Sequence, residues 1–132
     1  MRVMAVDHGL ARAGCAISDP SGTIVMPLGV VEPTDPEAVA RLAIEHDAEL
    51  VVVGLPVSLS GEEGPQAVEA RAFVAALATH VDVPVETYDE RLTTRLAAMT
   101  ARAGATAPAD ALAAAHLLES YLEWRSATER PD

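Results

Sequence analysis

Asp7 is the residue in this chain best placed to do chemistry. It ends a strand-like run that is otherwise mostly apolar, and Gly9 follows two residues later. Removing a charged group from water is costly unless an opposite charge compensates for it. We infer that a metal ion provides this compensation here. Glu90 and Asp110 are two later carboxylates in suitable settings to share the ion.

Three carboxylates brought together would repel one another, and some would take up protons unless a cation were present. Mg²⁺ and Mn²⁺ prefer oxygen ligands and keep water molecules for a substrate. Two such ions about 4 Å apart can activate a water molecule and stabilise the leaving oxygen of a phosphodiester. We therefore predict that Asp7, Glu90 and Asp110 hold two such ions. For Glu90 and Asp110 taken singly, a turn or helix-cap role stays open, because helix N-termini favour acidic residues.

The order of the predicted elements explains how residues so distant in sequence can meet. The predicted strands cover residues 2–7, 13–18, 23–31, 50–54 and 83–87, and the predicted helices cover 37–46, 65–80, 93–104 and 107–125. Three strands followed by alternating helices and strands favour an α/β fold, with a mixed sheet and helices on both faces. The first strand is then central and the last helix packs across it. We expect a single domain over residues 1–125 and a flexible tail over 126–132.

The charge of the chain argues against simple binding to nucleic acid. Nine basic residues, all of them arginines, face twenty acidic ones, so the formal net charge is −11 at pH 7. This charge repels polyanions at long range, whereas proteins that bind the phosphate backbone usually carry clustered Lys and Arg. Bound divalent cations or a local basic stripe would be needed to overcome the repulsion. Arg12, Arg91 and Arg95 are the candidates for phosphate contacts, and an exposed or ion-paired role stays open for each.

Nothing in the sequence indicates a membrane or secreted protein. No window reaches the roughly 18 apolar residues of a membrane span, and the N-terminus leads directly into a strand without a cleavage signal. The single cysteine, Cys15, lies in an apolar run and is expected to be a small buried residue. We expect a cytoplasmic protein.

Four segments along the chain together carry a resemblance to a known family. They are Val6-Asp7-His8-Gly9 with residues 12–20, residues 53–56 with 61–66, residues 89–94, and residues 110–122. In this order and at this chain length, the set resembles the YqgF/RuvX family of Holliday-junction-resolvase-like or pre-16S rRNA nucleases. The resemblance implies an RNase H-like fold with a mixed five-stranded sheet. It also implies a metal-dependent nuclease whose catalytic acids are Asp7, Glu90 and Asp110.

The resemblance further implies hydrolysis of phosphodiester bonds in structured RNA or in branched DNA. For RNA the expected role is 5′-end processing of pre-16S rRNA in ribosome biogenesis. Two departures concern substrate binding. Leu10-Ala11-Arg12 stands where the family usually has Thr-Lys-Arg, and residues 104–109 lack the family's basic cluster.

Because of these departures, a non-catalytic RNase H-like interaction module that has lost its nucleic-acid-binding surface stays open as an alternative. An actin-like ATPase shares the Asp-x-Gly opening but needs two such domains, and this chain is long enough for one. The sequence leaves open the choice between endonuclease and exonuclease, and that between monomer and homodimer.

Overall fold

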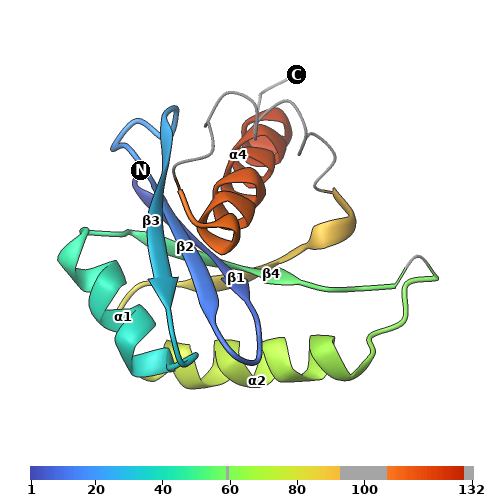
Figure 1. The fold of residues 1–132 in the computed structure, drawn as a ribbon. Coiled ribbons are helices and arrows are strands. Elements are labelled where there is room, and N and C mark those ends of the chain that lie inside the picture. Colours follow the sequence, from blue (N-terminus) through green and yellow to red (C-terminus); the bar gives the residue numbers. More distant parts are fainter. Residues whose placement is uncertain (59, 93–106, 130–132) are drawn as a thin grey trace.

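A mixed sheet of five strands runs through the centre of the computed structural model, which describes residues 1–58, 60–92 and 107–129 (Figure 1). The strands are β1 (Val3–His8), β2 (Ala13–Ser18), β3 (Val25–Val31), β4 (Leu50–Leu55) and β5 (Val85–Asp89), in the spatial order β3-β2-β1-β4-β5. β1 pairs antiparallel with β2 and parallel with β4, and β5 continues the parallel side. The predicted mixed sheet with a central first strand is confirmed. Because β1, β4 and β5 are parallel, their carboxyl ends lie at one edge of the sheet.

Helices cover both faces of this sheet, as predicted. α1 (Pro36–Glu45) and α2 (Pro65–Ala78) lie on one face, and α4 (Ala109–Glu129) crosses the other (Figure 1). α1 begins where the Asp35 carboxylate accepts a hydrogen bond of 3.1 Å from the Glu37 amide, which is a typical N-cap. Both α1 and α2 start with a proline, at a position where the missing N–H has no partner to lose.

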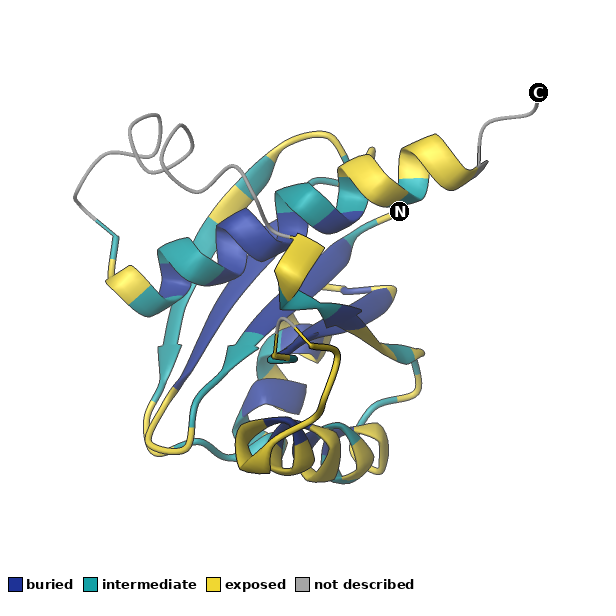
Figure 2. Cartoon of the chain, turned by 90° about the vertical axis from the view of Figure 1, so that its right-hand side faces the viewer, coloured by how far each residue is buried: buried dark blue, intermediate teal, exposed yellow. Residues whose placement is uncertain are grey.

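Alternation along β1 divides the core into two layers. Met4 and Val6 pack with α1 and α2, whereas Val3 and Ala5 pack with α4, and all four are fully buried. Figure 2 shows the buried strands enclosed between helices that are exposed on their outer sides. Because side chains of a strand point alternately to its two faces, Asp7 falls on the α4 face.

The turn between β2 and β3 is built on one carboxylate. Asp19 accepts hydrogen bonds from the backbone amides of Thr23 and Ile24, at 2.8 and 2.9 Å. These bonds hold both residues in the turn, so β3 begins at Val25 rather than at the predicted Thr23. They also lower the pKa of Asp19 to about 2, together with a bond from the Ser21 hydroxyl, which has the largest effect.

The last helix is longer than predicted. α4 continues to Glu129, past the expected end at Arg125, and the Arg125 guanidinium donates to the Tyr121 hydroxyl one turn earlier. The other ends of the described helices and strands agree with the prediction within two residues. The helix expected over 93–104 lies outside the described residues. None of the helices that the structure describes combines the length and apolar character that a membrane span requires.

Candidate functional site

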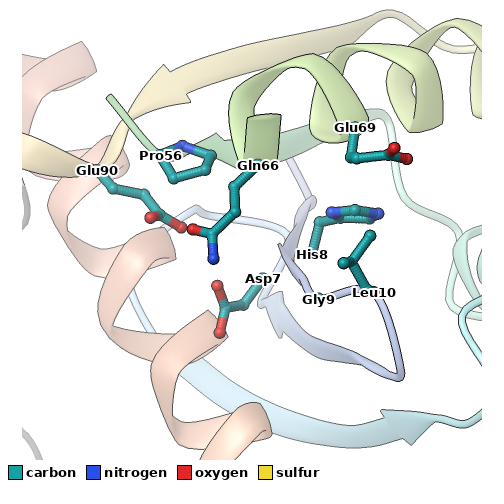
Figure 3. A pocket seen from close by; sticks show the side chains of 8 residues that line it. All are labelled: Asp7, His8, Gly9, Leu10, Pro56, Gln66, Glu69 and Glu90. Carbon is teal, nitrogen blue, oxygen red and sulfur yellow. The ribbon is translucent and has the colours of Figure 1, made fainter. Parts of the chain in front are cut away.

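Asp7 and Glu90 lie side by side at the carboxyl edge of the sheet. Asp7 stands near the end of β1, and Glu90 opens the 3₁₀ turn η1 (Glu90–Leu92) directly after β5. Their carboxyl groups are close enough to share a hydrogen bond, and both line one pocket (Figure 3). Two carboxyl groups can form such a bond only when one of them holds a proton.

Burial raises the pKa of both carboxyl groups. For Asp7, desolvation is the largest cause, the bond with Glu90 opposes it, and the charge of Asp110 adds to it. For Glu90, desolvation followed by the charge of Asp7 raises the pKa to about 7. The contact between them raises the pKa of Glu90 and opposes the rise at Asp7, so Glu90 is the carboxyl group of the pair that takes up a proton first as the pH falls.

Asp110 reaches the same region from α4 but is paired with an arginine. Its Oδ2 accepts a hydrogen bond of 2.7 Å from Nε of Arg12, and Nη1 of Arg12 lies 3.6 Å from a carboxylate oxygen of Glu32. The charge of Asp110 nevertheless raises the pKa of Asp7, so the two carboxylates are near neighbours. Arg12 thus neutralises Asp110 and competes with any cation for it.

Two glycines inside strands allow these acids to approach the sheet. A Cβ atom on Gly14 of β2 would collide with the backbone carbonyl of Asp110, so the first turn of α4 rests directly on the strand. Gly14 is also the β2 partner of Asp7. A Cβ on Gly54 of β4 would lie 2.7 Å from Oε1 of Glu90. A glycine within a strand often marks such a close approach, and this signal was available in the sequence.

The Asp7–Glu90 pair fits a hard divalent cation. The two carboxyl groups are adjacent oxygen donors, and a cation would relieve the repulsion that a proton relieves now. Across residues 1–58, 60–92 and 107–129, no group of three His, Cys, Asp or Glu side chains is arranged to hold a metal ion. The third carboxylate, Asp110, is paired with Arg12. The assignment of all three acids to metal stays a prediction.

The pocket continues from the acidic pair along the start of α2. It has a volume of about 240 Å³. Its other lining residues are His8, Gly9, Leu10, Pro56, Gln66 and Glu69. His8 faces the α2 layer, with its ring centroid 4.8 Å from that of Phe73, and still borders this pocket. The three-residue spacing of Gln66 and Glu69 at the start of a helix puts them on one face, which is the sequence signal that could have found them.

The arginines predicted to contact phosphate are ion-paired where they are described. Arg12 binds Asp110, and Nη2 of Arg91 lies 2.6 Å from Oδ2 of Asp89. Arg91 also lies close to Gly61, in the loop before α2. Arg95 is outside the described residues. A phosphate that bound Arg12 or Arg91 would compete with the carboxylate that now pairs with it.

Cys15 lies in the core, as expected, and so does Tyr121 of α4. Cys15 is fully buried, and desolvation raises its pKa to about 12. Tyr121 is 1% exposed and packs edge-on against Tyr88, with ring centroids 5.5 Å apart. Trp124 is 47% exposed and packs beside both tyrosines.

Glu90 should make the stability of the metal-free protein depend on pH. Its pKa is about 7 in the folded state, above the ordinary value of 4.5, so the folded state retains a proton that the unfolded chain has lost. The stabilisation is complete below about pH 4.5 and is lost as the pH rises through 7. We expect the free energy of unfolding to fall by about 1–2 kcal/mol across this window, allowing for solvent screening of a half-buried group.

The measurement is urea unfolding in EDTA at pH 5 and pH 8. Glu90→Gln should lose this part of the pH dependence. Glu45→Gln, which removes an exposed carboxylate at the end of α1, should keep it. Parallel pH profiles for the wild type and Glu90→Gln would contradict the assignment of the proton to Glu90.

Comparison with known proteins finds relatives along nearly the whole chain. Residues 1–124 match the family described as "RuvX: Holliday junction resolvase". A protein of Thermobifida fusca named "Putative pre-16S rRNA nuclease" is 47% identical over 106 residues, which cover 78% of this chain and 67% of the relative. A protein of Chloroflexus aggregans with the same name is 40% identical over 133 residues, covering 93% of this chain and 94% of the relative.

The architecture is similar to that of solved resolvases. The RuvC of Thermus thermophilus in complex with Holliday junction substrate gives a TM-score of 0.66 at 16% identity, covering 94% of this chain and 96% of that one. The fowlpox virus resolvase in complex with substrate Holliday junction DNA gives 0.58 at 14% identity, covering 95% and 99%. At such identities the likeness concerns the fold, and it confirms the RNase H-like architecture. From the match over residues 1–124 and the relatives that share its length, the chain belongs to the RuvX family.

Proposed function

We propose that the protein is a divalent-metal-dependent nuclease that hydrolyses phosphodiester bonds in structured RNA. The observation that carries the proposal is the contact between Asp7 and Glu90 at the mouth of a pocket, on the carboxyl edge of the central strands. Family membership and the names of the curated relatives support this reading, and those names favour pre-16S rRNA as the substrate, for which we propose processing of the 5′ end. Such a role belongs to ribosome biogenesis in the cytoplasm.

In this proposal Asp7, Glu90 and Asp110 hold Mg²⁺ or Mn²⁺. When bound, the ions supply an activated water molecule and stabilise the charge on the leaving oxygen. Asp7 and Glu90 are fixed by β1 and by the turn after β5, so they present their oxygens without rearrangement. Glu90 must give up the proton it holds near neutral pH, and Asp110 must leave Arg12.

Arg12 and Arg91 have a second role in this proposal. Both are exposed and both are held by carboxylates. A phosphate group can take the place of either carboxylate as an arginine partner, because Arg binds both with the same forked geometry. Substrate binding at Arg12 would therefore release Asp110 toward the metal.

Branched DNA is the second candidate substrate, because the matched family is described as a Holliday junction resolvase. The test incubates the purified protein with a 5′-extended pre-16S rRNA fragment and, separately, with a four-way DNA junction, in Mg²⁺, Mn²⁺ or EDTA. We expect cleavage of the RNA with either metal and none in EDTA. Cleavage of the DNA junction alone would identify branched DNA, rather than RNA, as the substrate. If neither substrate is cleaved in the presence of metal, the result would favour the non-catalytic module.

A further inference from the structure

The pocket has an arm that the proposed hydrolysis does not use. Beyond the acidic pair it continues between the start of α2 and the end of β1, where Glu69 lies beside His8 and the Gln66 amide extends toward Asp7 and Glu90 (Figure 3). Within the described residues, no hydrogen bond occupies the Gln66 amide or the Glu69 carboxylate, and the charge of Glu69 acts on the neighbouring His8. Both groups are therefore available to a ligand.

The charge of this arm decides which part of a nucleic acid can enter it. Beyond the acidic pair the carboxyl group of Glu69 lines the arm, and no arginine is among the residues that line the pocket. A phosphate would be repelled there, whereas a neutral group that donates hydrogen bonds would be attracted. Glu69 accepts such bonds, and the Gln66 amide both donates and accepts.

The walls of the arm are apolar and suit a flat group. Leu10 is 71% exposed at the rim, and Pro56 borders the pocket from the end of β4. The His8 ring is held against Phe73 and forms another wall. A nucleoside combines these requirements, because its base has apolar faces and its edge and sugar carry amino or hydroxyl donors.

We propose that this arm binds the nucleoside next to the cleaved phosphate, with Gln66 and Glu69 as its hydrogen-bonding partners. The inference rests on the proposed nuclease function, because only a phosphate at the acidic pair places a nucleoside in the arm. Gln66 and Glu69 then act in substrate recognition and positioning rather than in the chemical step.

The test measures the binding of a fluorescently labelled five-nucleotide RNA, with Ca²⁺ in place of Mg²⁺. Glu69→Gln and Gln66→Ala should each weaken binding by roughly tenfold, the usual cost of one hydrogen bond that involves a charged or buried group. Glu45→Gln removes the same charge from α1 and serves as the control. General electrostatics predicts the opposite sign for Glu69→Gln, because removing a negative charge should strengthen binding to RNA.

Two further probes separate the base from the sugar. If the arm holds the base, a pentamer that is abasic at every position should bind the wild type and both variants equally. If the arm holds the 2′-hydroxyl, an all-deoxy pentamer should bind the wild type and both variants equally. Unchanged or tighter RNA binding by Glu69→Gln would overturn the inference, as would no detectable binding by the wild type. A loss of Mn²⁺ affinity in Glu69→Gln, measured by calorimetry, would overturn it by placing Glu69 on the metal.

The binding assay needs no cleavage, so the two proposals can fail separately. RNA binding that depends on Gln66 and Glu69, in a protein that cleaves neither substrate, would support the nucleoside site and contradict the proposed nuclease activity. Metal-dependent cleavage with an unchanged KM in both variants would do the reverse. In an active enzyme we expect the KM to rise in both variants and the kcat to stay within about twofold.

Discussion

Replacing Asp7 with asparagine is expected to lower metal-dependent cleavage by roughly a thousandfold or more, while making the folded protein more stable. Asparagine keeps the shape of the side chain but removes the charge that binds a divalent cation, and losses of this order follow when such electrostatic stabilisation is removed. Stability should rise because Asp7 is a half-buried carboxylate that pays for its desolvation and is repelled by Asp110.

The measurements are cleavage rates at saturating Mg²⁺ and the Tm in EDTA at pH 8, where we expect an increase of a few degrees. Asp19→Asn is the matched control, because it makes the same chemical change in the β2–β3 turn at the other end of β2. It should lower stability through weaker bonds to Thr23 and Ile24, and should leave the cleavage rate unchanged. A variant at Asp7 that cleaves as fast as the wild type would remove this carboxylate from the mechanism.

Replacing Gly14 with alanine is expected to cost about 3 kcal/mol of stability or more and to abolish cleavage. The added Cβ would collide with the backbone carbonyl of Asp110, which is not a flexible side chain and cannot turn away. The start of α4 must then lift from β2, and this moves Asp110 away from Asp7 and opens the core beneath it. Overpacking of a core usually costs 1–3 kcal/mol, and a clash with backbone lies at the upper end.

Urea unfolding measures the loss, and cleavage at a temperature where the variant is still folded measures the displacement of Asp110. Gly64→Ala is the control for stability, because a Cβ there meets nothing within 4 Å and its φ of −86° suits alanine. It should cost less than about 1 kcal/mol. Wild-type stability in Gly14→Ala would show that α4 does not rest on β2 as described.

The ion pairs around the site indicate how an acidic protein could still bind a nucleic acid. The described arginines near the site, Arg12 and Arg91, are paired with Asp110 and Asp89, which offset their attraction for a polyanion until a carboxylate is displaced. Surface ion pairs of this kind are weak, typically below about 1 kcal/mol, and a phosphate can exchange into them. Binding is then expected to depend strongly on divalent cations and on salt.

Local pattern was sufficient to predict most of the architecture. The apolar run before Asp7, the turn signal at residues 19–22 and the helical spacing after Pro65 each depend on a few neighbouring residues. Those short-range features set the order of strands and helices, and the order in turn limits the sheet to few topologies. The central position of β1 and the meeting of Asp7 with Glu90 follow from that order, because parallel strands end at a common edge.

Contacts between elements distant in sequence could not be predicted in this way. Which partner Asp110 chooses depends on the position of Arg12 across 98 residues, and the arm beside Gln66 exists only because α2 packs against the end of β1. Gly14 shows the same limit, since a glycine in a strand indicates a close approach without naming what approaches. Periodicity and turn propensity are properties of neighbouring residues, whereas these contacts depend on the packing distance between layers, which the folded chain sets as a whole.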